Sequence, residues 1–354
     1  MNTQTLISNL NLEDETDRSY AAEDLGYTGS VEAITPLIER LTVETSLMVR
    51  DTIFSALDRI DNPEVIRQVA ALLDSDDAFL RNQAVALLQR KGGASAEVLL
   101  LKMNDPDPDV RKFVLDAAAG ISSALVDPIF AAAMRDQDVN IVIAALEHVG
   151  ERRMFAFKTD VEQLFLDGTE PMLVCSAFSA LLQIGDAASW QCILRRYPTA
   201  ASVPGWELGW WIRALGEFGA VGEIEVFHEF LQSHDGKGRR DTIDALERFQ
   251  ARYGRVGITG EFWEVLRAML PACSASEEKL QLLRVFGGFD APPAIGDYLL
   301  GLLEGDDRLT KLAAIEALKR LRRPDLTTRL RERLGIEADA EVIAVLEECE
   351  GKSR

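Results

Sequence analysis

The amino-acid sequence predicts an all-α fold, an α-solenoid in which about ten helix pairs stack into one continuous right-handed superhelix. A short phrase of acidic, basic, small and apolar residues recurs at intervals of roughly 30 residues along the 354-residue chain. Aromatic residues make up only 7% of the chain, while Ala and Leu are abundant, which favours helices over strands. No run of alternating apolar and polar residues is long enough to predict a sheet.

The recurring phrase opens with an acidic residue, reaches a basic residue after a short gap, and places small and apolar residues three and seven positions later. Its clearest copies carry the basic residue at Arg18, Arg50, Arg81 and Arg111, which are 32, 31 and 30 residues apart, and Lys311 is their late counterpart. Weaker copies begin at Asp138, Pro171, Trp206, Gly238 and Glu278. Because a fixed period is typical of repeat proteins, each copy predicts one repeat.

Each phrase predicts one helix of a pair. Arg18, Ala21 and Leu25 are three and seven positions apart and therefore share one helical face. The acidic residue before the helix can accept hydrogen bonds from its first backbone N–H groups. A second amphipathic stretch precedes the phrase, as in residues 33–41 and 63–73. Two helices of about 12 residues, with their turns, fill the period of roughly 30 residues.

We expect residues 1–354 to form a single solenoid. Within it, the regularity of the phrase distinguishes three parts. Regular repeats are expected over 1–150, irregular repeats with insertions over 151–275, and regular repeats with a C-terminal cap over 276–354. The spacing between copies loosens in the middle part. Insertions are therefore expected near residues 151–160, 186–205 and 251–260.

The formal net charge of −20 limits the choice of partner. Nucleic acids and anionic membrane surfaces attract basic proteins, so neither is expected to bind this chain. The charge is compatible with a protein partner that has a basic surface, although solubility is the more common explanation. Residues 1–17 lack the basic and apolar regions of a secretory signal, and no apolar run approaches the roughly 18 residues of a membrane span. We therefore expect a cytoplasmic protein.

Few residues point to catalysis. The three histidines, His148, His228 and His234, and the four cysteines are scattered without the spacing of a metal site. The sequence contains no glycine-rich nucleotide-binding motif and no nucleophile motif. It therefore predicts no catalytic residue, no metal and no cofactor, and it favours binding over enzymatic activity.

The series of Asp, an apolar residue and Arg, as in Asp109-Val110-Arg111, followed by small and apolar residues, resembles the HEAT-repeat family. The similarity is greatest to the short bacterial HEAT-like units that also occur in phycobilisome lyases, and it covers most of the chain. The resemblance implies a helix-pair solenoid whose arginine-bearing helices line the concave face. It implies no single function, because such repeats serve many unrelated roles.

The resemblance also implies a ladder in which Asp and Arg connect successive repeats. Carried onto this chain, it gives Arg50, Arg81 and Arg111 a structural role. The copies that begin at Asp138, Pro171 and Trp206 lack the basic residue at that place, so the ladder should be interrupted there.

Trp206, Trp210 and Trp211 form the first candidate partner-binding site, because three of the five tryptophans fall within six residues. On a helix, Trp206 and Trp210 share a face, while Trp211 points about 100° away. One face should pack in the core, and an exposed tryptophan on the other could anchor a partner. The alternative is that all three fill gaps at an irregular repeat junction.

The second candidate is a series of acidic residues on the concave helices. Stacked repeats would align them into a stripe able to orient a basic partner, although a solvated face is the common explanation. The members of this series are Glu23, Asp24, Asp51, Asp58 and Asp116.

The function expected from these observations is a non-enzymatic adaptor or scaffold that grips a protein or peptide on its concave surface. The alternative is a phycobilin lyase-like protein, since the stretch from Asp17 to Gly26 resembles an early Tyr-Ala-Ala…Leu-Gly stretch of those proteins. That resemblance implies a groove in which a bilin contacts four residues, Tyr20, Glu23, Asp24 and Asp51. The same stretch is also a common repeat phrase. The scaffold therefore remains the favoured hypothesis.

Overall fold

A computed structural model describes residues 2–233, 237–273, 276–290, 293–305, 307–321, 323–334, 340 and 342–345. These residues form 21 α-helices, nine 3-10 helices and two strands of two residues each. The prediction of an all-α solenoid is confirmed, whereas the number of repeats and the handedness of the superhelix stay predictions. The chain divides into two compact units, residues 1–161 with 169–177 and residues 162–168 with 178–354.

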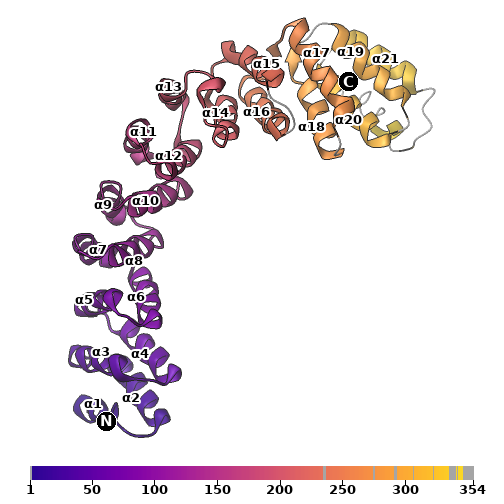
Figure 1. The fold of residues 1–354 in the computed structure, drawn as a ribbon. Helices are drawn as coiled ribbons and strands as arrows, with labels where there is room; N and C mark the ends of the chain where they lie inside the picture. The colour runs from indigo at the N-terminus through magenta and orange to yellow at the C-terminus, as the bar shows by residue number, and fades with distance from the viewer. Residues whose placement is uncertain are drawn as a thin grey trace. The chain divides into compact units, whose positions relative to one another are not determined.

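The helices of the first unit alternate between two layers (Figure 1). One layer contains α1 (Thr3–Asn9), α3 (Ile34–Val43), α5 (Pro63–Ala71), α7 (Ala96–Lys102) and α9 (Asp127–Ala133). The other contains α2 (Glu15–Thr28), α4 (Leu47–Arg59), α6 (Ala78–Lys91), α8 (Pro108–Ala119) and α10 (Val139–Glu151). The 3-10 helices η1 (Val31–Ala33), η2 (Leu72–Asp74), η3 (Gly92–Ser95), η4 (Ala124–Val126) and η5 (Phe155–Phe157) lie in the connections. Each predicted repeat phrase of this unit therefore becomes an even-numbered helix.

Aspartates begin four of these five helices, α2, α6, α8 and α10, as the phrase predicts, whereas α4 follows Ser46, whose side chain makes no capping hydrogen bond. The side chains of Asp14, Asp77, Asp107 and Asp138 each accept a hydrogen bond from a backbone N–H two residues later, at 2.8 or 2.9 Å. These bonds satisfy N–H groups that have no partner inside the helix.

A small residue at the end of the phrase lets helices of one layer approach closely. At the α2–α4 contact, a Cβ added to Gly26 would lie 2.7 Å from the Cα of Ala56, so no side chain fits there. Between the two layers, apolar side chains such as Leu25, Leu37 and Leu57 are completely buried. The core of each repeat therefore lies between its own two helices and those of its neighbours.

Basic side chains close the C-terminal ends of the even-numbered helices. Arg152, which follows α10, donates to the carbonyl oxygens of Ala118 at 2.9 Å and Ile121 at 2.8 Å, at the end of α8. Lys91 donates in the same way to the Ile60 carbonyl after α4, at 3.2 Å. These carbonyl groups would otherwise lack partners, because the last turn of a helix leaves them free.

The boundary between the two units passes through α11 (Lys158–Asp167) and α12 (Pro171–Ile184). In the second unit, one layer contains α13 (Ala187–Arg196), α15 (Ile224–Ser233), α17 (Gly260–Met269), α19 (Pro293–Gly301) and α21 (Pro324–Leu334). The other contains α14 (Leu208–Phe218), α16 (Lys237–Tyr253), α18 (Ser276–Phe286) and α20 (Arg308–Leu321). The connections include η6 (Ala200–Ser202), η7 (Val221–Glu223), η8 (Leu270–Ala272) and η9 (Leu302–Glu304).

The segments expected to hold insertions are largely helical. Residues 151–160 contain η5 and the start of α11, and residues 186–205 contain the whole of α13. Residues 254–259, between α16 and α17, contain the strand β1 (Val256–Gly257), which pairs in parallel with β2 (Phe289–Asp290). The expected C-terminal cap begins with α21, while its residues 335–339, 341 and 346–354 lie outside the described part of the chain. Within the described residues, no helix combines the length and apolarity that a membrane span requires.

Candidate partner-binding surface

The side of α2 that faces solvent carries two tyrosines and two carboxylates, which we call the α2 stripe. Its members Tyr20, Glu23, Asp24 and Tyr27 follow the spacing of one helical face. Tyr20 is 62% exposed and Tyr27 is 69% exposed, and the Arg59 guanidinium lies 4.6 Å from the centre of the Tyr27 ring. The stripe therefore combines apolar area and negative charge at the surface.

Helix α4 extends this surface beside the α2 stripe. The hydroxyl groups of Ser19 on α2 and Thr52 on α4 are 2.9 Å apart, which fixes the two helices side by side. Next to Thr52 along α4, Asp51 is exposed, and Met48 lies one turn earlier. Among the described residues, no cationic group lies within 4 Å of the carboxylates of Glu23, Asp24 or Asp51.

The other two members of the predicted acidic series are neutralised inside the chain. Asp58 accepts from Arg90 Nε at 2.6 Å. Asp116 pairs with Lys112 at 3.0 Å and lies 3.5 Å from His148. Burial would raise the pKa of Asp116, but hydrogen bonds from His148 and Lys112 outweigh it and lower that pKa. Asp58 and Asp116 are therefore paired inside the chain, whereas Glu23, Asp24 and Asp51 have no ion pair among the described residues, and the partner-binding role of the series stays a prediction.

Beneath this surface, arginines of the even-numbered helices bind acidic residues of the next repeat. Arg18 binds Glu44 through two hydrogen bonds, at 2.8 and 3.0 Å, and Arg50 binds Asp77. Arg111 binds Asp136 through two bonds of 2.7 Å. These pairs are the predicted ladder between repeats.

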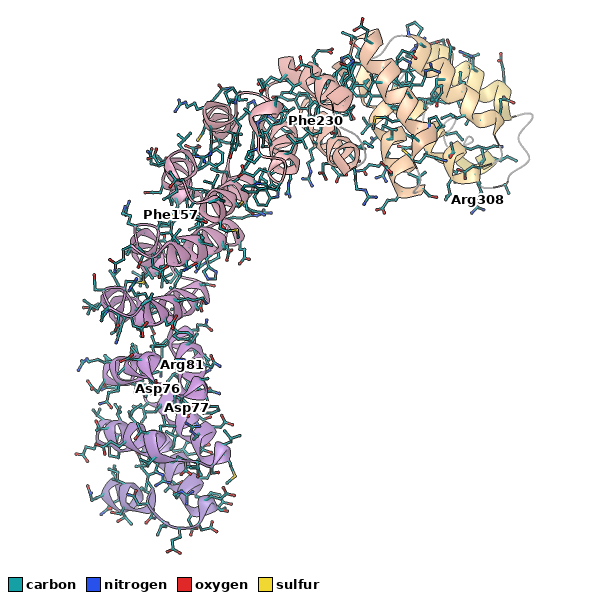
Figure 2. All side chains as sticks on the ribbon, viewed as in Figure 1. Asp76, Asp77, Arg81, Phe157, Phe230 and Arg308 are labelled. Carbon is teal, nitrogen blue, oxygen red and sulfur yellow. The ribbon has the colours of Figure 1, made fainter. Side chains whose placement is uncertain are left out.

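Arg81 departs from that ladder. It donates to the carbonyl oxygen of Ser75 at 2.6 Å, and its guanidinium lies 5.3 Å from the centre of the Phe113 ring. Figure 2 shows Arg81 with Asp77 at the start of α6. Arg81 therefore has a structural role, as the resemblance implies, but its partners are a backbone carbonyl group and an aromatic ring in place of an acidic residue of the next repeat.

Glu44 is the buried anion of the first rung. Burial alone would raise its pKa, but hydrogen bonds from Arg18, the Ser46 N–H and Arg40 outweigh that effect and lower it to about 2. The Thr45 N–H also donates to this carboxylate, at 2.9 Å. Every charge in this cluster is therefore paired, which is the condition for keeping a buried carboxylate ionised.

The three tryptophans of the first candidate site, all in the second unit, have different environments. Trp206 lies in the turn before α14 and is 57% exposed, while Trp210 is half-buried with its ring 6.1 Å from that of Phe178. Trp211 is only 1% exposed, packs 5.3 Å from Trp190 and donates to the Tyr197 carbonyl at 3.2 Å. The hypothesis that Trp211 contacts a partner is thus corrected, since its side chain fills the core.

Glu207, between Trp206 and α14, was not singled out by the sequence. It is 1% exposed, and its Oε2 has no hydrogen-bond partner. Burial raises its pKa, although a hydrogen bond from Tyr197 and the charge of Arg196 act in the opposite direction. The sequence around Glu207 contains no repeat pattern from which the burial of its side chain could have been predicted.

The two histidines in the described part of the chain lie on different helices, α10 and α15. His228 stacks on Phe262 with ring centres 5.2 Å apart, and His148 lies in the last turn of α10. His234 is outside the described residues. In the described ranges, no group of three or more His, Cys, Asp or Glu side chains is arranged to hold a metal ion.

A comparison with known protein families matches residues 3–89 to the model of HEAT repeats. Residues 3–89 are HEAT repeats. The α2 stripe, Asp51 and the first two rungs of the arginine ladder lie within these HEAT repeats, whereas Trp206 and Trp210 do not. No curated protein matches the chain.

Two structures similar to this chain extend the comparison beyond the matched HEAT repeats. A homology model of the full-length AP-3 complex in an intermediate open conformation is 12% identical with a TM-score of 0.56, and the match covers 95% of this chain and 72% of that one. The complex of CpcE and CpcF of phycocyanin lyase from Nostoc sp. PCC7120 is 17% identical with a TM-score of 0.28, covering 77% of this chain and 95% of that one. The first likeness shows the fold alone, and the second is too low in shape similarity to support an argument.

Proposed function

We propose that this protein is a non-enzymatic scaffold that binds a protein or peptide partner on the α2 stripe and the adjoining side of α4. The observation that carries the proposal is the combination of two exposed tyrosines, Tyr20 and Tyr27, with three carboxylates that have no cation within 4 Å among the described residues. Aromatic side chains that remain exposed are enriched at binding hot spots. A helical repeat array offers them a rigid and extended support.

The chemistry of this surface favours a partner with lysine or arginine side chains. Carboxylates at Glu23, Asp24 and Asp51 can accept charge-assisted hydrogen bonds, and the exposed Tyr20 ring can attract a cation as the Tyr27 ring does with Arg59. The net charge of −20 would speed the approach of a basic partner at low salt. Shape complementarity over the even-numbered helices would supply the remaining area.

The lyase-like alternative uses the same residues, because a bilin would also contact Tyr20 and the neighbouring carboxylates. The two functions differ in what is bound. A bilin gives the protein a visible absorption band, whereas a protein partner does not.

The test is purification of the tagged protein from its native cells, followed by an absorbance scan and mass spectrometry. The double variant Asp24→Asn/Asp51→Asn should lose a stoichiometric partner at least about tenfold, which is the expected loss for two charge-assisted contacts. The matched control is Glu32→Gln/Glu39→Gln, which removes two exposed carboxylates, one from the connection η1 and one from α3 in the other layer. Equal recovery of the partner with both variants contradicts the scaffold proposal, and a visible band with phycobiliprotein subunits replaces it by the lyase-like function.

A further inference from the structure

The solvent side of α14 contains an arginine without an anionic partner. Trp210, Arg213 and Glu217 are three and seven positions apart and therefore lie along one side of the helix. Arg213 is half-buried, and its Nε is enclosed without a hydrogen-bond partner. Among the described residues, no carboxylate oxygen lies within 4 Å of its guanidinium.

The groups that could neutralise Arg213 are already occupied. Glu217, one turn further along α14, binds Arg248 of α16 at 2.5 Å. Asp241 of α16 approaches α14 at Gly209, where its Oδ2 would lie 2.8 Å from an added Cβ, and it has a partner of its own. Arg213 is thus an uncommitted cation in a protein with twenty more acidic than basic side chains.

Other arginines of the second unit are used inside the chain. Arg252 donates to the carbonyl oxygen of Gly219 at 3.0 Å, and Arg196 donates to that of Phe165 at 2.9 Å. Partly enclosed guanidinium groups are normally paired, because their donors lose water without replacement otherwise. The lack of such a partner at Arg213 therefore favours binding of an anionic group from another molecule.

Aromatic surface adjoins this cation. Trp210, three residues before Arg213, is half-buried against Phe178, and Trp206 is exposed in the turn that leads into α14. We call Trp206, Trp210 and Arg213 the α14 patch. A ligand that suits the patch has a carboxylate for the guanidinium fork and an apolar neighbour for the tryptophan rings.

We propose that the α14 patch binds an acidic side chain of a peptide segment, Asp or Glu, with an adjacent apolar side chain packed on the tryptophans. This inference rests on the proposed scaffold function and adds a second point of contact of the opposite charge. The α2 stripe selects cations, and the α14 patch selects an anion. We therefore expect the segment that binds the α14 patch to contain an acidic and an apolar residue. It binds there despite the negative net charge of this protein, because Arg213 supplies a local positive charge.

The proposal can be tested on the full chain with ¹⁵N-labelled indole groups. The probe is N-acetyl-Leu-Asp-Leu amide, the matched probe has Asn in place of Asp, and the signals of Trp206 and Trp210 are assigned with Trp→Phe variants. The Asp probe should move the Trp210 indole signal and should bind at least about tenfold more tightly than the Asn probe. Arg213→Gln should abolish that preference, and Arg213→Lys should retain part of it because the charge remains without the fork.

The controls separate this patch from general charge effects. Arg195→Gln removes an exposed positive charge from α13 and should leave the preference for Asp unchanged. Asp24→Asn/Asp51→Asn should also leave it unchanged, so failure at the α14 patch and failure at the α2 stripe are distinguished. The proposal is overturned if no indole signal moves, or if Arg213→Gln keeps the preference for Asp. It is also overturned if an Asn probe with a free C-terminus binds as well as the Asp probe, since the terminal carboxylate would then be the recognised group.

Discussion

Glu44 is a buried carboxylate whose charge stabilises the first unit. Its pKa of about 2 in the folded chain lies below its ordinary value of 4.5, so its stabilisation is complete above pH 4.5 and is lost as the pH falls toward 2. Glu44→Gln should lower the free energy of unfolding at pH 7 by about 3 kcal/mol, because Arg18 and Arg40 then lose their anion.

Urea unfolding of the wild type and Glu44→Gln at pH 7 and pH 3 measures this effect. The gap should shrink at pH 3, where the wild type also begins to lose the charge. The exposed control Glu39→Gln should stay within about 0.5 kcal/mol at both pH values. A gap that is the same at both pH values would show that the lost shape, not the lost charge, destabilises the variant.

Glu207 should have the opposite pH dependence. Its pKa is raised by burial, so the folded chain favours the neutral carboxyl group. Folding is therefore most favourable below the ordinary value of 4.5 and becomes less so as the pH rises through the raised pKa. Glu207→Gln should stabilise the protein at pH 7 by about 1 kcal/mol, since it removes a buried carboxyl group whose ionisation is disfavoured and whose Oε2 has no hydrogen-bond partner. Thermal unfolding at pH 7 and pH 4 checks this, and a variant that is less stable at pH 7 contradicts it.

At the scale of helices, Arg152 connects α10 to the end of α8. It supplies charged donors to the carbonyl oxygens of Ala118, Ala119 and Ile121. Arg152→Ala should lower the free energy of unfolding by about 2 kcal/mol, because these carbonyl groups lose their donors. The control Arg135→Ala breaks the exposed pair with Asp160 and should cost less than about 1 kcal/mol in the same urea titration. Equal losses would mean that Arg152 contributes no more than a surface charge.

The helices of the first unit were predictable because the phrase repeats three signals together. Asp77 caps α6, Arg81 turns toward the preceding loop, and Ala84 lies buried between helices, so capping, charge and packing agree. In the segments without the basic residue, the same spacing signal was lost. Helix α13 therefore fell in a region expected to hold an insertion.

The candidate site was only partly predictable, because pairing depends on the register between helices. Asp58 meets Arg90 one repeat later; the repeat period predicts that their helices are neighbours, but it does not predict which side chains pair. The tryptophan cluster raises a related difficulty, since α14 begins at Leu208 and leaves Trp206 in the preceding turn. Helical spacing grouped Trp206 with Trp210, but only the packing shows that Trp211 faces the core.

For the whole molecule, the charge balance sets how stability responds to salt. The chain has 58 acidic and 38 basic residues, and several basic side chains are used at helix ends and in the ladder. The remaining surface carboxylates repel one another, which disfavours the compact state. Salt screens the interactions between exposed charges that are separated by more than the Debye length. This length falls from about 30 Å at 0.01 M salt to about 10 Å at 0.1 M, while buried pairs are screened much less.

The midpoint of thermal unfolding at pH 7 should therefore rise when NaCl is increased over that range. The same series near pH 4.7, the isoelectric point of the sequence, provides the control, because the net repulsion vanishes there and the rise should vanish with it. A midpoint that falls with salt at pH 7 would mean that attraction between exposed ion pairs such as Arg135–Asp160 outweighs the repulsion. A rise at both pH values would point to a general salt effect on burial of apolar surface and would remove the argument from net charge.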